Sequence, residues 1–278
     1  MNKYSTKMNQ TVIITGASTG IGRAAAEYFA SKGWNVAATM RNPEKYPELK
    51  SISGIKTYVL DVTNPSSIDA ALSQIQNDFG RIDALVNNAG YGVDGVFEAM
   101  SDAVIEKQFD TNVFGLMRMT RAIIPIFRNQ KSGTIIQIAS VGGRVAFPLF
   151  SIYHGTKWAV EGFSESLRYE LEPLGIKMRI IEPGAIKTDF YNRSRVFVKP
   201  ETTNQYDEFV AKCEKTSSNA GNTGASALSV AKVIYRAATD GGNRLRYATG
   251  FPAPMLLWMR KWMPDSWFKF VVKSSYGI

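Results

Sequence analysis

Cysteine and histidine are almost absent from this chain of 278 residues, in which each occurs once, as Cys213 and His154. A single cysteine excludes an intrachain disulfide and fits a reducing compartment. Because zinc sites draw most of their ligands from these two residue types, we expect no metal site. We interpret Cys213 as a loop or core residue rather than a nucleophile.

Long hydrophobic runs are missing too. No stretch reaches the roughly 20 apolar residues that a membrane-spanning helix needs. The apolar run after the polar first ten residues, 11–15, is too short for the core of a signal peptide. We therefore expect a cytoplasmic protein. With 45% hydrophobic and 21% charged residues the composition is that of a globular chain, and we expect one domain over residues 1–278.

Short β-branched runs alternate with longer helical stretches. This alternation predicts an α/β fold, a three-layer doubly wound parallel sheet with helices on both faces. The expected strands are 11–15, 35–39, 55–60, 82–86, 133–139, 176–181 and 246–249, and the expected helices are 21–31, 65–79, 101–128, 150–171 and 226–239. We expect residues 184–223 to form a substrate loop with one short helix near 206–213, followed later by a C-terminal extension, 251–278.

Three glycines join the first expected strand to the first helix with the spacing G-x-x-x-G-x-G. Glycines let the backbone turn sharply and let a pyrophosphate approach, and the helix N-terminus offers unpaired N–H groups to the phosphate. The motif predicts a dinucleotide site, with a structural turn that binds no ligand as the alternative. The residues expected to line it are Gly16, Ser18, Thr19, Gly20, Ile21 and Gly22.

Acidic residues are missing from the end of the second strand, where NAD-binding sites usually carry the Asp or Glu that holds the ribose 2′-hydroxyl. Thr39, Met40 and Arg41 stand there, and the next acid is Glu44. An acid would repel a 2′-phosphate, whereas Arg41 can pair with one through two hydrogen bonds. We therefore predict that NADP(H) is preferred over NAD(H). In the alternative interpretation, Arg41 is a solvated surface residue.

Tyr153 and Lys157 are four residues apart in an expected helix and share one of its faces. A free tyrosine has a pKa of about 10, and a nearby lysine cation lowers this pKa by favouring the phenolate. Such a tyrosine can protonate the alkoxide that develops when a carbonyl accepts a hydride. Ser140 ends the fifth strand, at the sheet edge where ligands bind, and we expect it to hydrogen-bond the substrate oxygen. Alone, this pair arises by chance in many helices, and a serine at a strand end often caps a turn.

Taken in order, these motifs resemble those of the short-chain dehydrogenase/reductase family over nearly all of residues 11–190. Asn112 matches the family's helix asparagine, and Ser140, Tyr153 and Lys157 match its other catalytic positions. Further matches to its cofactor-binding segments are Asp61, Val62, Asn87, Asn88, Ala89, Gly90, Pro183, Gly184, Ile186 and Thr188.

The resemblance implies a Rossmann-like fold and a nicotinamide that carries the hydride. It implies that Tyr153 exchanges a proton with the substrate oxygen and that Ser140 orients this oxygen. It also implies that Lys157 binds the ribose and tunes Tyr153, and that Asn112 holds a water of a proton relay through its backbone. A homodimer or homotetramer is implied as well, with the helices expected at 101–128 and 150–171 at the interface.

The expected function is hydride transfer between NADP(H) and a ketone, aldehyde or secondary alcohol, which makes the chain a carbonyl reductase or alcohol dehydrogenase. The aromatic and methionine content of its variable segments favours a lipophilic substrate, and the extended tail is similar to that of the hydroxysteroid and retinol dehydrogenase subgroup. Thr19 stands where some NADP-preferring members carry a base, so the cofactor prediction depends mainly on Arg41. The alternative function is a catalytically silent NADP(H)-binding regulator.

Several apolar residues flank the expected site, and ordinary core packing is the alternative interpretation for each. These candidate pocket residues are Val93, Phe97, Phe147, Pro148, Leu149, Phe190 and Tyr191. His154 directly follows Tyr153. Because adjacent helix positions point about 100° apart, we expect it to face away from the substrate.

The extension at 251–278 combines three tryptophans, Trp258, Trp262 and Trp267, with many bases. Residues 241–278 hold six bases and one acid, and so carry five of the nine surplus positive charges of the chain. We favour an amphipathic segment that closes the active site or packs on a partner subunit. Attachment to an anionic membrane surface is the less favoured alternative. Nucleic-acid binding is not expected, because nothing else indicates a recognition module.

Overall fold

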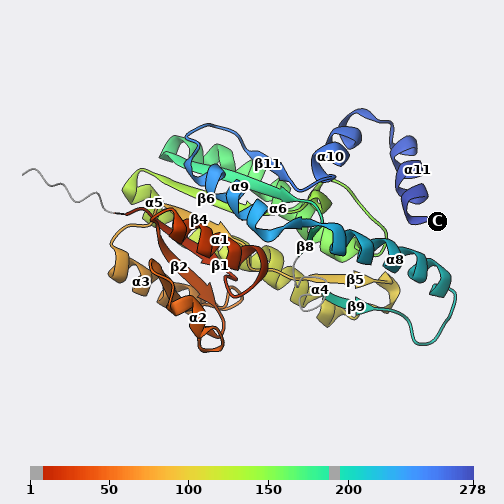
Figure 1. Ribbon diagram of the computed structural model, residues 1–278, viewed down its shortest axis with the longest axis horizontal. Helices are drawn as coiled ribbons and strands as arrows, with labels where there is room; N and C mark the ends of the chain where they lie inside the picture. Colours follow the sequence, from red (N-terminus) through yellow and green to blue (C-terminus); the bar gives the residue numbers. More distant parts are fainter. Residues whose placement is uncertain (1–8, 188–194) are drawn as a thin grey trace, which may run out of the picture.

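The computed structural model describes residues 9–187 and 195–278. Its main sheet has seven parallel strands in the order β11-β7-β6-β4-β1-β2-β3 (Figure 1). These strands are β1 (Thr11–Thr15), β2 (Asn35–Met40), β3 (Ile55–Val59), β4 (Ala84–Asn87), β6 (Gly133–Ile138), β7 (Ile176–Pro183) and β11 (Arg246–Thr249). The longer helices are α1 (Gly20–Ser31), α3 (Pro65–Phe79), α4 (Asp102–Phe109), α5 (Leu116–Gln130), α6 (Ser151–Leu171), α8 (Asp207–Thr223), α9 (Ala227–Thr239), α10 (Ala253–Trp262) and α11 (Asp265–Tyr276). The short elements are α2 (Pro47–Lys50), η1 (Pro43–Lys45), η2 (Phe97–Ala99), η4 (Val141–Gly143) and η5 (Glu172–Leu174).

Helices cover both faces of this sheet because successive strand side chains point to opposite faces. Val12 and Ile14 of β1 pack in one buried cluster with residues of α1 and α9, whereas Ile13 between them packs in a second cluster with residues of α3, α5 and α6. Both faces are apolar, which is why the strands read as nearly continuous hydrophobic runs rather than as alternating ones. The three-layer doubly wound fold predicted from the sequence is therefore confirmed. The single-domain organisation stays a prediction.

The helix expected at 101–128 is interrupted. A π-helical segment, η3 (Asp110–Gly115), lies between α4 and α5 and contains Asn112, which is 2% exposed. Single π-helical turns inside a longer helix are frequent at functional sites. The helical pattern of the sequence continues through the segment, so the expectation of one unbroken helix was wrong at Asn112, one of the predicted catalytic residues.

The expected loop at 184–223 is more ordered than predicted. It contains β8 (Ile186–Lys187) and β9 (Arg195–Val198), and its helix α8 runs on to Thr223 instead of ending near residue 213. β9 pairs in parallel with β5 (Gly92–Gly95), a strand that the sequence pattern did not reveal, and β8 pairs with β10 (Ala225–Ser226). Arg195 binds Asp94 across the β5–β9 pair with Nε–Oδ1 at 2.7 Å, and Asp94 is only 1% exposed. This ion pair fixes the first half of the substrate loop to the sequence that follows β4.

The C-terminal extension forms two helices, α10 and α11, which lie together at one end of the molecule (Figure 1). Ala253 and Leu257 of α10 and Phe268 of α11 are buried with Val141 and Val145, near the start of η4. The extension is thus packed on the segment that follows β6. Among the residues that the structure describes, no helix combines the length and apolar content that crossing a bilayer requires.

Candidate active site

The glycine turn between β1 and α1 is closely packed against the end of β4. Gly16 has φ +65°, and a Cβ built on it would lie 2.9 Å from the Ala89 Cα. A Cβ on Gly22 would overlap the Asn88 side-chain nitrogen and the Gly16 oxygen. Only glycine satisfies both the left-handed backbone at residue 16 and the close approach at residue 22. These two positions fulfil the steric requirement predicted from the spacing.

The N-terminus of α1 is open for an anion. Its N-cap residue, Thr19, makes no side-chain hydrogen bond to the first turn, and Ser18 and Ile21 beside it are only partly buried. The first-turn N–H groups therefore keep their partial positive charge available to a phosphate. The geometry of the turn is compatible with the pyrophosphate of a dinucleotide, the ligand that the motif predicts.

Asn88 and Thr15 hold this turn in place. The Asn88 side chain donates to the Thr15 oxygen at 2.9 Å and to the Gly16 oxygen at 3.1 Å. The Thr15 hydroxyl accepts hydrogen bonds from the backbone N–H groups of Asn88 and Ala89, both at 3.0 Å. The ends of β1 and β4 are thus joined directly beside the position expected for the cofactor, with Gly90 next in the chain.

Beneath them, the buried Asn87 side chain donates to Thr120 at 3.0 Å and to Gln137 at 2.9 Å. These bonds link β4 to α5 and to β6, the neighbouring strand. The matched segment 87–90 thus has two structural roles. Asn87 connects β4 with α5 and β6, and Asn88 holds the glycine turn through its side-chain hydrogen bonds.

The predicted adenosine end lies at the carboxyl ends of β2 and β3. Arg41 directly follows β2, is exposed, and makes no hydrogen bond or ion pair within the described part of the chain. The nearest acid in sequence, Glu44, is bound to Lys50 at 2.9 Å. Asp61 follows β3, and its Oδ1 accepts from the Thr63 N–H at 2.9 Å. The neighbour of Asp61, Val62, is buried with the residues of the α3 face.

The predicted nicotinamide end lies after β7. Pro183 ends this strand and is buried, and the Gly184 N–H donates to the Thr249 oxygen of β11 at 2.8 Å. Ile186 is 6% exposed in the short strand β8. Thr188, which the motif also assigns to this region, lies outside the described residues.

Tyr153 and Lys157 lie on one face of α6, as their spacing predicts. The Lys157 Nζ is 5.7 Å from the centre of the Tyr153 ring and donates to the Ile138 oxygen at the end of β6, at 2.8 Å. Burial lowers the pKa of Lys157 to about 8, and the negative charge of Glu161 partly opposes this shift. A cation is thus held against the tyrosine in surroundings that screen it poorly.

Asn112 is clamped between two elements. Its Oδ1 accepts from the Tyr91 N–H at 3.1 Å, and its Nδ2 donates to the Tyr91 oxygen at 2.8 Å and to the Thr156 hydroxyl at 3.2 Å. The Thr156 hydroxyl in turn donates to the backbone carbonyl oxygen of Tyr153 at 2.7 Å. The π-helical turn therefore contacts α6 beside the predicted catalytic residue Tyr153, through hydrogen bonds that the sequence did not indicate.

Ser140 follows β6 and caps η4, because its Oγ accepts the Gly142 N–H at 3.0 Å. The side chain of His154 also approaches Gly142, since a Cβ on this glycine would lie 2.7 Å from the His154 Nε2 and 3.4 Å from the Ser140 Oγ. The His154 Nδ1 accepts the Phe147 N–H at 3.3 Å, and burial lowers the pKa of His154 to about 4. His154 is therefore a neutral, buried group that lies near Gly142 and Ser140.

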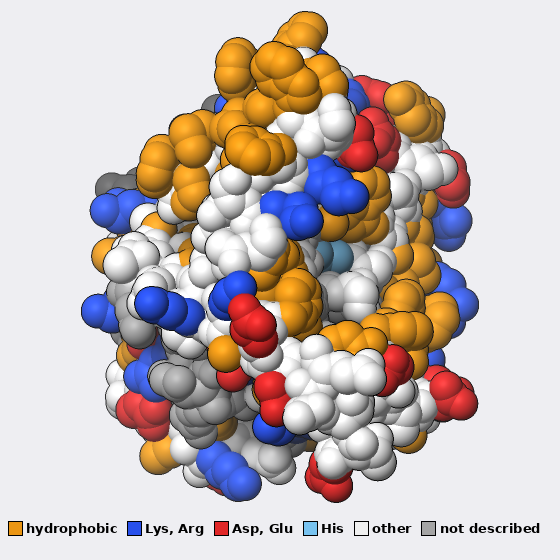
Figure 2. Space-filling view, turned by 90° about the vertical axis from the view of Figure 1, so that its right-hand side faces the viewer, with side chains coloured by type: hydrophobic (Ala, Val, Ile, Leu, Met, Phe, Trp, Pro, Cys, Tyr) orange, Lys and Arg blue, Asp and Glu red, His pale blue; other side chains and the backbone are white. Residues whose placement is uncertain are grey.

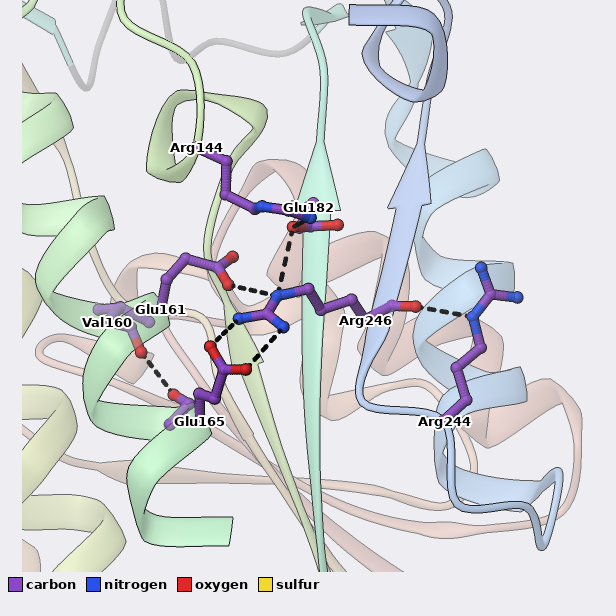
Figure 3. A network of polar contacts seen from close by, with 8 residues as sticks. Arg144, Val160, Glu161, Glu165, Glu182, Arg244 and Arg246 are labelled. Atoms are coloured by element: carbon purple, nitrogen blue, oxygen red, sulfur yellow. Dashed lines mark hydrogen bonds and ion pairs between the residues drawn. The ribbon is translucent and has the colours of Figure 1, made fainter. Parts of the chain in front are cut away.

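A buried charge network behind α6 was not foreseen from the sequence (Figure 3). Arg246 of β11 binds Glu161 at 2.9 Å and Glu165 at 2.8 Å, both on α6, and lies 3.8 Å from Glu182 of β7. Arg144 reaches Glu182 from the other side at 3.4 Å. Burial, and then the neighbouring Glu182 charge, raise the pKa of Glu161 to about 7. The signal available in the sequence was the four-residue spacing from Lys157 to Glu161, which places both on one helix face.

The candidate pocket residues separate into different classes. Val93 is 1% exposed in a small core cluster, whereas Phe97 is 57% exposed. Phe147, Pro148 and Leu149 are half-buried. Leu149 has φ +68°, and its oxygen accepts the Gly95 N–H at 2.8 Å. The remaining two candidates, Phe190 and Tyr191, lie outside the described residues.

Comparison with known proteins gives this arrangement a family. A family profile described as short chain dehydrogenase matches residues 10–197. The 3-ketodihydrosphingosine reductase of Bacteroides thetaiotaomicron is 30% identical over 271 residues, which cover 97% of this chain and 98% of that protein.

Solved structures agree with this result. A short-chain dehydrogenase from Streptomyces avermitilis superimposes with a TM-score of 0.83 and 32% identity, covering 96% of each chain. A serine dehydrogenase solved with NADP⁺ superimposes with a TM-score of 0.74 and 29% identity, covering 87% of this chain and 94% of the other.

Proposed function

This chain belongs to the short chain dehydrogenase family, and from that premise we propose that it transfers a hydride between NADP(H) and a lipophilic ketone or aldehyde, or the corresponding alcohol. Membership itself makes it a nicotinamide-dependent oxidoreductase with a Rossmann-type fold. The observation that carries the proposal is the buried Lys157 ammonium, held 5.7 Å from the centre of the Tyr153 ring at the carboxyl edge of the sheet. A protein that only sensed the cofactor would have no use for this acid/base pair.

Each proposed catalytic residue has a task that its contacts allow. When bound, the nicotinamide supplies or accepts the hydride. Tyr153 holds the exchanged proton at its phenol oxygen, and the Lys157 cation stabilises the phenolate left after donation. The Ser140 Oγ already accepts the Gly142 N–H, so its own O–H remains free to donate to the substrate oxygen. The Asn112 side chain is fully engaged, so any water of the relay would be held by its main chain.

We propose a substrate whose carbonyl lies on a long or bulky apolar skeleton. The match to a 3-ketodihydrosphingosine reductase over 97% of this chain favours a long-chain keto compound. The apolar segment at 147–149, just before α6, supports a lipophilic pocket wall.

The function is tested by adding the purified protein and NADPH to a panel that contains 3-ketodihydrosphingosine, a steroid ketone, a short-chain ketone and an aldehyde, while following NADPH absorbance. Turnover of the apolar ketones with little turnover of the short-chain one is expected. Cofactor binding without turnover of any compound would instead favour the catalytically silent regulator.

The preference for NADP(H) is also a proposal, and its support is the unpaired Arg41 after β2. We expect Arg41→Asp to lower the ratio of the NADPH and NADH kcat/KM values by about 10–100-fold, because a charge-assisted hydrogen bond contributes about 1.5–3 kcal/mol. The control is Lys232→Asp, which makes the same charge change on an exposed base of α9, a helix outside the proposed subunit interface. An unchanged ratio in the Arg41 variant would show that the 2′-phosphate is bound elsewhere or not at all.

We further propose a homodimer or homotetramer that pairs through the long helices α5 and α6, and a cytoplasmic location. Phe114 of η3 and Trp158 of α6 are each about half exposed, at 50% and 49%. Large apolar side chains on neighbouring helices are a typical basis for such an interface.

A further inference from the structure

The outer surface of α10 and α11 exposes an unusual amount of apolar area. Six large side chains there have 45–77% of their surface exposed, and we call them the C-terminal patch: Phe251, Met255, Trp258, Trp262, Trp267 and Phe270. The described residues hold thirteen exposed large hydrophobic side chains, so nearly half of them lie within 20 consecutive residues. Hydrophobic side chains gather at the top of the face in Figure 2, over these helices. Contiguous apolar surface of this kind generally marks an interaction site.

The patch is a second apolar face, separate from the one that attaches the extension to the sheet. Ala253 and Leu257 point α10 into the core, whereas Met255, Trp258 and Trp262 follow the spacing of one outward stripe. On α11, Phe268 is buried while Trp267 and Phe270 are exposed. When the extension packs onto the sheet, none of the described residues covers the exposed side chains of the C-terminal patch.

Positive charge surrounds the patch. Lys261, Lys269 and Lys273 are exposed on the same two helices, and the Lys261 Nζ lies 5.0 Å from the centre of a tryptophan ring. The one acidic side chain of these helices, Asp265, is paired with Arg260 at 2.8 Å. Three lysines are left without an acid on either helix. A second copy that paired through the same patch would bring six such lysines together, which argues against self-association here.

The patch is joined to the candidate active site through its inner side. Phe147 packs in the cluster that holds Leu257, and its ring centre lies 6.3 Å from that of Tyr276 on α11 and 5.7 Å from that of His154. His154 is next to Tyr153 on α6. Whatever covers the patch therefore lies on the outer side of the segment that precedes the catalytic helix.

We propose that α10 and α11 dock on the surface of a bilayer that contains anionic lipids, with the tryptophans among the headgroups and the lysines against lipid phosphates and carboxylates. Tryptophan with lysine or arginine on a helix that is too short or too polar to cross the bilayer is the pattern of interfacial attachment. A bilayer satisfies both features of the patch, since it offers apolar depth and negative charge together. Docking of this kind would bring the catalytic face to the place where lipophilic carbonyl compounds dissolve.

The experiment is vesicle flotation of the full chain with phosphatidylcholine alone and with phosphatidylcholine containing phosphatidylserine. We expect the partition coefficient to rise on the order of 100-fold with the anionic lipid, because each lysine near such a surface contributes about a fivefold increase. The increase should fall steeply with added salt. Equal partitioning into both kinds of vesicle, or into neither, would overturn the proposal.

The variant with Trp258→Gln, Trp262→Gln and Trp267→Gln is expected to lose vesicle binding by about tenfold or more, because its apolar contribution is removed. Leu228→Gln, which changes an exposed apolar residue on α9, a helix outside the proposed subunit interface, is the control and should bind like the wild type. If the triple variant fails to fold, the double variant Lys261→Gln and Lys269→Gln tests the same surface, because it removes two of the positive charges expected to bind anionic lipid.

Two further results would contradict the proposal. One is unchanged vesicle binding by all patch variants. The other is a fall in solution mass, measured by light scattering, that occurs only in the tryptophan variant, since this would assign the patch to a second copy. Vesicle binding requires no turnover, and turnover of a water-soluble carbonyl by the patch variants should equal that of the wild type. A failure of docking is therefore distinguishable from a failure of the proposed reaction.

Discussion

Tyr153→Phe is expected to lower kcat/KM for the best carbonyl substrate by about 10²–10⁴-fold, because it removes the group that exchanges the proton with the substrate oxygen. The ring, its contact with Lys157 and the packing of α6 stay in place, so NADPH binding should change little. Steady-state kinetics give the loss, and quenching of protein fluorescence by NADPH gives the binding constant.

Tyr169→Phe is the matched control for this prediction, since it removes a tyrosine hydroxyl from the same helix at a position that is 69% exposed. It should leave both measurements unchanged. Activity of the Tyr153 variant within a few-fold of wild type would move the proton donor to another group.

Arg246→Met is expected to destabilise the protein by about 3–5 kcal/mol near pH 8, the cost typical of a buried ion pair that loses one partner. Glu161 and Glu182 would remain buried, with side chains 6% and 2% exposed. Arg144 forms an ion pair with Glu182 and acts on Glu161 only through its more distant charge. Guanidinium unfolding, followed by circular dichroism, measures the change. A loss below about 1 kcal/mol, the value for exposed pairs, would contradict a role of this network in stability.

The loss of unfolding free energy in the Arg246→Met variant should depend on pH in a defined direction. The folded-state pKa of Glu161 is raised to about 7, so the native chain keeps a proton that the unfolded chain releases above its ordinary pKa of 4.5. Stability linked to Glu161 is therefore fully present below pH 4.5 and is lost as the pH rises through about 7. The Arg246→Met cost should shrink near pH 5. Glu161→Gln, which carries no charge, should make the wild-type curve flatter across this window.

The part of the site that could be predicted from the sequence is the part that depends on local order. Tyr153 and Lys157 share a helix face through their spacing alone, and Ser140 reaches the ligand-binding edge because it ends a parallel strand. The glycine turn belongs to the same class, since it depends on one strand and the helix that follows. Each of these predictions needed only the assignment of a single element and the parallel direction of the sheet.

The parts that were missed depend on contacts between distant residues. β5 and β9 are short and become strands by pairing with each other, with Asp94 and Arg195 separated by 101 positions in the chain. The π-helical turn follows from the two hydrogen bonds between Asn112 and the backbone of Tyr91, which the helical pattern around residue 112 does not encode. Arg246 lies 81 positions from Glu165, so the charge network was equally hidden, although the spacing of Lys157 and Glu161 was visible.

The order of strands in the main sheet also bears on how the chain can fold while the ribosome synthesises it. β1, β2 and β3 extend the sheet in one direction, and β4, β6, β7 and β11 then extend it in the other, each next to a strand already synthesised. None of these strands has to be inserted between two earlier neighbours, because β4 adds to the edge of β1 that β2 leaves open. The strand order therefore allows a growing chain to add each strand to an existing edge as it emerges. Only the last edge, where Arg246 closes the charge network, has to wait for release of the C-terminal third.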